Sequence, residues 1–70
     1  MKYKLNDEYI ELFKLLKVLD LVDSGAQAKH LVAEGYVNRN GESELRKRAK
    51  IISGDIIEIA DVTITVLRNK

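Results

Sequence analysis

Residues 56–66 read IIEIADVTITV, and this stretch decides the fold of the 70-residue chain. Apolar and polar side chains alternate on each side of Ala60-Asp61, a pattern typical of two strands joined by a tight turn. Pairing across that turn gathers one apolar face, made of Ile57, Ile59, Val62, Ile64 and Val66. The other face holds Glu58, Thr63 and Thr65. The stretch therefore predicts an antiparallel pair whose apolar face needs a covering layer.

Two helices upstream are expected to cover that face. Residues 7–20 predict the first helix, because apolar side chains recur there at spacings of three and four residues. The members of this stripe are Leu12, Leu15, Leu16 and Leu19. Asn6 or Asp7 is the expected N-terminal cap, since short polar side chains accept hydrogen bonds from the free amides of a first turn.

Residues 24–34 predict a second, shorter helix. Ser24 and Gln27 fit a capping box, and Gly35 stands where a left-handed residue ends a helix. The expected core joins both helices to the final hairpin and consists of Leu12, Leu15, Leu16, Leu19, Leu31, Val32, Ile57, Ile59 and Ile64. The chain is therefore predicted to be α+β, with two helices packed on a small, mostly antiparallel sheet.

Further segments extend the predicted sheet. Asn40-Gly41 is a strong signal for a two-residue hairpin turn, because both central positions of such a turn need positive φ. It joins strands expected near Val37–Arg39 and Glu42–Glu44, whose polar side chains favour an edge of the sheet. Lys2–Leu5 is a candidate additional strand.

Composition excludes most catalytic and metal chemistry. The chain has no cysteine and a single histidine, His30, which rules out thiol nucleophiles and histidine-rich metal cages. We expect no catalytic residue, no metal and no cofactor. No apolar run reaches the roughly 18 residues of a membrane helix, and the first residues lack a secretory signal. We expect one domain over residues 1–70, cytoplasmic and monomeric, with no membrane or small-molecule partner.

Positive charge is concentrated in the middle of the chain. Residues 24–50 hold six Lys and Arg against three Asp and Glu, whereas each flanking part holds one more acidic than basic residue. If residues 45–51 are extended, Arg46, Arg48 and Lys50 share one face. Such a row is either a solvated strand face or a set of phosphate contacts, since arginine can hold phosphate oxygens with two parallel hydrogen bonds.

Several short pieces of the sequence stand in the order and spacing of a known family. These pieces are Leu15-Leu16-Lys17, Asp23-Ser24-Gly25-Ala26-Gln27-Ala28-Lys29, Glu34-Gly35-Tyr36-Val37-Asn38, Asn40-Gly41, Arg46-Lys47-Arg48 and Gly54-Asp55. Through them the chain, over roughly residues 8–67, resembles the S-four RNA-binding domain, also called the alpha-L motif. Within that family it is most similar to short stand-alone bacterial proteins of the YbcJ/YaaA type.

The resemblance implies non-enzymatic binding of structured RNA, often ribosomal or transfer RNA, with ribosome assembly as a candidate role. Carried over residue by residue, it implies RNA contacts at Ser24, Gln27, Lys29, Asn38, Arg39, Asn40, Arg46, Lys47, Arg48 and Lys50. The chain departs from the family pattern at Gly25, where many members have an arginine, and at Arg39 and Ser43, where members tend to have apolar residues. The alternative function is a protein-interaction module that kept the fold and lost RNA binding.

The sequence allows two roles for each of two ring-bearing side chains. Tyr36 either packs partly buried behind the helix-ending Gly35 or stacks on a base. His30 is either a polar surface residue or an RNA contact. With one Phe and three Tyr the chain lacks an aromatic platform for single strands, so we expect recognition of the backbone shape of folded RNA.

Overall fold

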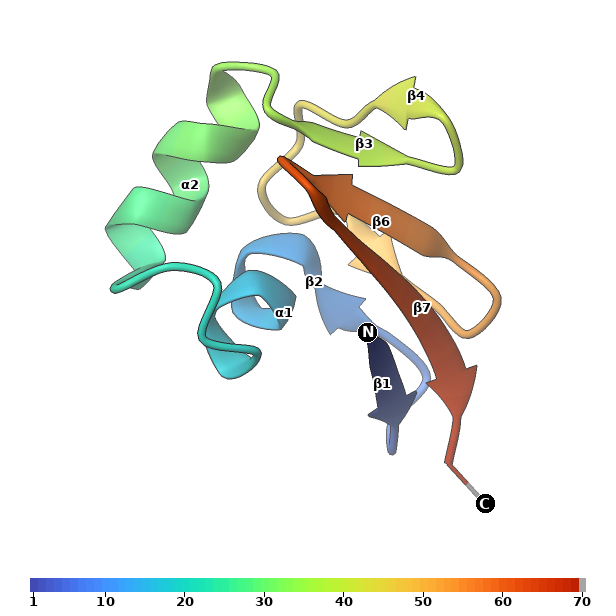
Figure 1. Cartoon of the computed structure of the whole chain (residues 1–70). Helices are drawn as coiled ribbons and strands as arrows, with labels where there is room; N and C mark the ends of the chain where they lie inside the picture. The colour runs from blue at the N-terminus through green and yellow to red at the C-terminus, as the bar shows by residue number, and fades with distance from the viewer. Residues whose placement is uncertain (70) are drawn as a thin grey trace.

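Figure 1 shows the computed structural model of the chain, which describes residues 1–69. Within these residues the helices are α1 (Leu12–Val18) and α2 (Gly25–Ala33). The strands are β1 (Lys2–Leu5), β2 (Ile10–Glu11), β3 (Val37–Arg39), β4 (Glu42–Ser43), β5 (Lys50–Ile51), β6 (Ile56–Ile59) and β7 (Val62–Arg68). Both helices lie on the same side of the sheet that contains β6 and β7, which confirms the predicted α+β architecture (Figure 1).

The main sheet has the strand order β1-β7-β6-β3-β4 among the described residues. Its centre is the predicted hairpin, in which Ile59 pairs with Val62 across Ala60-Asp61. The predicted strand at Lys2–Leu5 is present, and it pairs parallel with β7. The hairpin β3–β4 occupies the opposite edge, as its polar side chains predicted. A separate two-stranded sheet joins β2 to β5 in antiparallel register.

The core lies between the helices and one face of the main sheet. Its largest fully buried side chains are Leu12, Leu15, Leu16, Ile51, Ile57, Ile64, Val32, Val37 and Val66. Leu19 and Leu31 were expected there too, but both are only partly buried and pack against its margin. The reason is their position, since Leu19 is the C-terminal cap of α1 and Leu31 lines an open groove beside α2.

The first helix is shorter than its apolar stripe predicted. It begins at Leu12 instead of residue 7, and Glu11 takes the N-cap position, where its side chain accepts no capping hydrogen bond. The predicted caps, Asn6 and Asp7, lie outside the helix, and that prediction was wrong.

Long-range backbone pairing explains where α1 begins. The N–H groups of Leu12 and Phe13 donate to the carbonyl oxygens of Ala49 and Lys47, each at 3.0 Å. The preceding residues pair with β5 as strand β2. A distant loop therefore accepts hydrogen bonds from the first amides of α1, in place of a local capping side chain. The local sequence pattern carries no sign of this long-range pairing.

The second helix follows the sequence prediction closely. The Ser24 hydroxyl accepts a hydrogen bond from the Gln27 N–H at 3.1 Å, and the Gln27 side chain accepts one from the Asp23 N–H at 2.6 Å. Gly35 ends the helix with φ +84°, a conformation that suits glycine because it has no Cβ. The N-terminus of α2 is thus closed by its own side chains.

The hairpin turn at Asn40-Gly41 is also confirmed. Both residues have positive φ, 52° and 87°, as a type I′ turn requires. The turn places β4 at the edge of the sheet and directs the chain into residues 44–50, which contain the predicted basic row.

Candidate nucleic-acid interface

Residues 44–49, the basic loop, are not extended, so the condition under which Arg46, Arg48 and Lys50 would share one strand face is not met. Only Lys50–Ile51 is a strand, and the Ala49 N–H donates to the Arg46 carbonyl at 3.1 Å to close a turn. Ala49 and Ile51 are buried, as their apolar character predicted. The carbonyls of residues 47 and 49 accept hydrogen bonds from the first amides of α1, which ties this turn to the helix. The basic side chains therefore leave a curved loop in different directions.

Three cations surround the ring of Phe13. The Nζ atoms of Lys29 and Lys14 lie 4.9 and 5.9 Å from the ring centroid, and the guanidinium carbon of Arg48 lies at 5.4 Å. Cations are attracted to the electron-rich face of an aromatic ring at such distances. We call these four residues the Phe13 cluster.

The Phe13 cluster joins three parts of the chain. Phe13 and Lys14 come from α1, Lys29 from α2 and Arg48 from the basic loop. The structure thus brings two expected site residues, Lys29 and Arg48, to one place. Phe13 and Lys14 were not expected there, and the available signal was an aromatic residue lying outside the leucine stripe of its helix.

Glu11 holds two members of the Phe13 cluster. Its carboxylate lies 3.3 Å from Lys14 Nζ and 3.5 Å from Arg48 Nη1. Burial alone would raise the pKa of Glu11, but hydrogen bonds and charges from these two cations outweigh it and lower the pKa below its ordinary value. One carboxylate therefore holds both cations near the start of α1.

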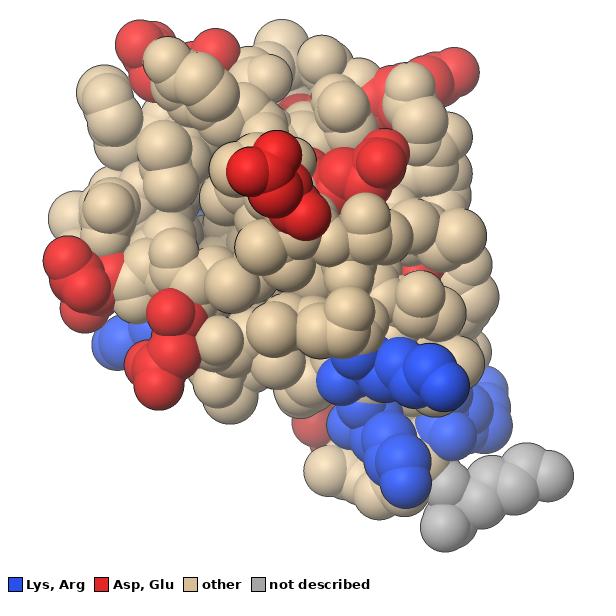
Figure 2. Space-filling model, viewed as in Figure 1, with Lys and Arg blue, Asp and Glu red and all other residues tan. Residues whose placement is uncertain are grey.

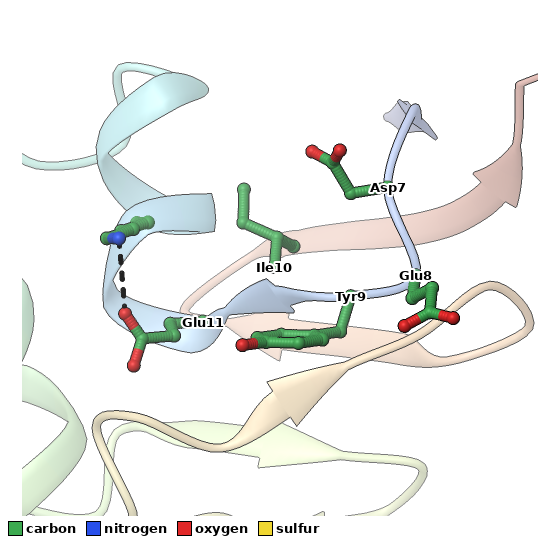
Figure 3. A pocket seen from close by; sticks show the side chains of 6 residues that line it. Asp7, Glu8, Tyr9, Ile10 and Glu11 are labelled. Carbon is green, nitrogen blue, oxygen red and sulfur yellow. Dashed lines mark ion pairs between the residues drawn. The ribbon is translucent and has the colours of Figure 1, made fainter.

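A hollow of about 620 Å³ borders this cluster on the side of Lys14. Residues 7–11 and Lys14 line it, and Figure 3 shows their side chains, with the ion pair between Glu11 and Lys14 as a dashed line. Lys50 Nζ lies 5.1 Å from the ring centroid of Tyr9, so a second cation–aromatic pair adjoins the first. The other charged residues of the hollow are acidic, which disfavours phosphate inside it.

Gly25 lies against the same cluster. It is the first residue of α2, and a Cβ built on it would be 3.8 Å from Phe13 Cδ2, an ordinary van der Waals distance. Its φ is outside the left-handed region. The backbone therefore has room for a side chain at the position where many family members carry arginine.

Arg46 is held by Glu44. Its Nε and Nη2 atoms donate to the two carboxylate oxygens at 3.0 and 3.1 Å. This hydrogen-bonded fork lowers the pKa of Glu44 to about 2, and Glu44 in turn raises the pKa of Arg46. The Arg46 side chain is still 74% exposed, whereas Glu44 is buried beneath it.

Arg39 and Asn40 are tied into the fold through Asp55. The Arg39 guanidinium donates to Asp55 Oδ2 at 2.8 Å and to the Lys50 carbonyl at 2.9 Å, and it lies 3.5 Å from Glu44. The Asn40 amide donates to Asp55 Oδ1 at 3.0 Å. Burial would raise the pKa of Asp55, but donors from Ile52, Asn40 and Arg39 lower it. RNA contact by Arg39 or Asn40 stays a prediction, and in this structure both residues support the loop.

The remaining expected site residues lie around these groups. Ser24 and Gln27 cap α2 beside Gly25, Lys47 is exposed on the basic loop, and Asn38 is half-buried on β3, where its Oδ1 accepts from Ser43 Oγ at 3.4 Å. His30 is exposed on α2.

Tyr36 does not pack as one interpretation expected. Its side chain is 62% exposed, because the left-handed Gly35 turns the chain outward at the end of α2. The exposed ring is available for a contact with another molecule.

The fold and this surface define the class of the protein: an alpha-L domain of the S4 family. The S4 domain model matches residues 3–67, and the chain belongs to that family. It is 42% identical over 59 residues to "Putative RNA-binding protein YbcJ" of Escherichia coli (strain K12), with 84% of each chain covered. It is 36% identical over 55 residues to "Probable ribosome maturation protein RlbA" of Bacillus subtilis (strain 168), with 79% of this chain and 78% of that protein covered.

A solved structure agrees with this assignment. The solution structure of YbcJ from E. coli matches with a TM-score of 0.73 and 39% identity, covering 94% of this chain and 85% of that one. It is described as revealing an alfaL motif involved in RNA-binding. In the part of this chain that the structure describes, no helix is long and apolar enough to cross a membrane, and no cluster of three acidic or histidine side chains is arranged for a metal ion.

Proposed function

We propose that this chain binds structured RNA, of the ribosomal or transfer type, and catalyses no reaction itself. The observation that carries the proposal is the Phe13 cluster, where cations from α1, α2 and the basic loop converge beside the N-terminus of α2. Three cations held close together favour a polyanion over a single small anion, because neutralised phosphates release their counterions. The names of the bacterial relatives support RNA as that polyanion.

The cluster supplies the phosphate contacts in this proposal. The Lys14 and Arg48 side chains are exposed, and both form ion pairs with Glu11. A phosphate can therefore replace or join Glu11 as their partner. The N-terminus of α2, the positive end of that helix dipole, lies beside Phe13 and adds positive potential on the same side. Lys47 and Lys50 extend the surface along the loop.

Polar residues at the margin position the RNA without reading a base sequence. Ser24, Gln27 and Asn38 offer donors and acceptors beside the cations, while Arg39 and Asn40 hold the loop and its Arg46 in place. With few aromatic side chains near the cations, recognition rests on the backbone shape of folded RNA. We infer action as a monomer in the cytoplasm, in ribosome assembly or a related step.

The test is a salt titration of binding to a folded ribosomal RNA fragment, with polyuridine as the single-stranded comparison. If about four cations contact phosphates, the logarithm of affinity falls with the logarithm of salt at a slope near −3 to −4, and the folded RNA binds more tightly. The double variant Lys29→Ala with Arg48→Ala should reduce the slope by about two.

A matched control separates this site from general attraction. Lys2→Ala with Lys4→Ala removes the same charge from exposed positions on β1, and its slope should stay as in the wild type. Equal losses in both double variants, or a flat salt response, would contradict the proposal. A salt-insensitive protein partner without RNA binding would favour the alternative of a protein-interaction module.

A further inference from the structure

An apolar groove lies between the end of α2 and the turn that joins β6 to β7. Its volume is about 220 Å³, and it is lined by Leu21, Leu31, Tyr36, Ile59, Ala60 and Val62. It shares no residue with the Phe13 cluster or with the basic loop. The proposed RNA surface therefore leaves the groove without a role.

Two tight turns give the groove its shape. The Gly35 and Tyr36 N–H groups donate to the carbonyls of Val32 and Leu31, each at 3.1 Å, which fixes Tyr36 at the end of α2. Ala60 holds φ +52° in the hairpin turn opposite. Both walls are thus set by backbone hydrogen bonds and sheet pairing, so an occupant would meet a preformed site.

Apolar side chains stay partly open at this groove. Tyr36 is an exposed ring, and Leu21, Leu31 and Val62 are only half-buried around it. These side chains line one groove together, whereas exposed apolar residues scattered singly over a surface need no partner.

Three exposed acidic residues flank the groove lining along the chain, and we call them the rim. Asp61 stands between the lining residues Ala60 and Val62, Asp20 precedes Leu21, and Glu34 lies two residues before Tyr36. Figure 2 shows acidic side chains scattered over this face, while its basic side chains gather mainly at the far end, beside β1 and the end of β7. Phosphate is repelled by such a rim, whereas Lys and Arg side chains are attracted.

We propose that this groove docks a basic peptide segment of a protein partner, with one large apolar side chain inserted against Tyr36. The volume is below the range of about 300–1,000 Å³ that is usual for small-molecule pockets, and it suits a side chain better than a cofactor. Charge complementarity with the rim selects Lys and Arg on either side of the inserted residue. The chain would then hold a protein partner at this groove and RNA at the Phe13 cluster.

A library of random dodecapeptides displayed on phage is the probe. The expected result is enrichment of peptides with several Lys or Arg around one Leu, Phe or Trp. Added to isotope-labelled protein, a synthetic copy of a selected peptide should shift the amide resonances of Leu31, Tyr36 and Val62. Tyr36→Ala should weaken its binding about tenfold or more, as removal of a central aromatic anchor does.

Matched variants keep the test sharp. Tyr9→Ala removes another exposed tyrosine, outside the groove, and should leave peptide affinity unchanged. Asp61→Lys reverses one rim charge on an exposed turn and should weaken basic peptides without unfolding the chain. The RNA affinity should stay as in the wild type in Tyr36→Ala, which separates this inference from the proposed function.

Three outcomes would overturn the inference. The first is that the selected peptides show no excess of Lys or Arg, or that Tyr36→Ala weakens the binding of none of them. The second is that the folded RNA shifts the groove resonances, which would assign the groove to RNA. The third is concentration-dependent self-association that Tyr36→Ala abolishes, which would assign it to a second copy of this chain.

Discussion

Arg39 holds Asp55 with two nitrogens on one oxygen: Nε lies 3.2 Å and Nη2 2.8 Å from Oδ2. The two residues are sixteen positions apart, and the same guanidinium also donates to the Lys50 carbonyl. This pair therefore fastens the hairpin β3–β4, the turn before β6 and the end of the basic loop to one another. Arg39 thus has a structural partner, Asp55, although the family tends to have an apolar residue at the position of Arg39.

Replacing Arg39 by methionine should lower the free energy of unfolding by about 2 kcal/mol or more. The apolar stem is kept, but the buried Asp55 loses its cation and keeps only the neutral donors of Asn40 and Ile52. Removing the charged partner of a buried carboxylate costs more than the pair itself contributes. Urea denaturation followed by circular dichroism measures the change. Lys47→Met, on the exposed part of the basic loop, is the control and should change stability by less than about 0.5 kcal/mol.

Acid should destabilise the fold through Glu44 and Asp55. The pKa of Glu44 is about 2 and that of Asp55 is also lowered, so both carboxylates hold their protons less tightly in the folded chain than in the unfolded one. Their stabilising effect is complete above the ordinary pKa values of 4.5 for Glu44 and 3.8 for Asp55, and it is lost as pH falls through the lowered values. Thermal unfolding between pH 6 and pH 2.5 measures this loss.

Glu44→Gln should flatten that pH dependence and reduce stability at pH 6. Glu42→Gln, which removes an exposed carboxylate from β4, is the control and should keep the wild-type slope. The same slope in all three proteins would show that the fork between Glu44 and Arg46 does not contribute to stability.

Phe13→Leu tests the aromatic ring of the Phe13 cluster. Leucine keeps apolar volume at a half-buried position, so the loss of stability should stay below about 1.5 kcal/mol. Lys14, Lys29 and Arg48 lose the ring face that gathers them, so affinity for the folded RNA should fall several-fold. Phe13→Tyr preserves a ring and should retain affinity. Unchanged binding by Phe13→Leu would mean that the ring does not organise the cations.

Gly25→Arg should strengthen RNA binding several-fold at moderate salt. The first atom of the new side chain meets Phe13 at an ordinary distance, and the added cation joins the Phe13 cluster. Arginine favours the helix over glycine by somewhat under 1 kcal/mol, and the positive end of the helix offsets part of that gain, so stability should be nearly unchanged. A salt titration should give a slope steeper by about one.

Gly25→Ala is the control for that experiment, since it adds a Cβ without a charge. Weaker binding by a folded Gly25→Arg variant, with Gly25→Ala unaffected, would mean that RNA approaches the start of α2 too closely for a long side chain. Weaker binding by both would assign the glycine to a close backbone contact.

The sequence by itself determined the parts of this protein that depend on neighbouring residues. The alternation in residues 56–66 specified the central hairpin and the face that it buries. Ser24, Gln27 and Gly35 specified both ends of α2, and Asn40-Gly41 specified the β3–β4 turn. In each case the signal is the spacing of apolar side chains, a capping side chain or the φ that a turn requires. Such a signal involves only a few neighbouring residues, so it predicts local structure without knowledge of the rest of the fold.

Only the tertiary structure decided the start of α1, the curvature of the basic loop and the assembly of the Phe13 cluster. The carbonyls of Lys47 and Ala49 replace a local cap for α1, and that pairing bends the segment which alternation alone described as a flat row. The Phe13 cluster combines residues 13, 14, 29 and 48. The ion pair that supports the basic loop joins Arg39 to Asp55. These contacts form between segments far apart in the chain. Their geometry depends on how the helices pack on the sheet, and no local sequence pattern encodes that packing.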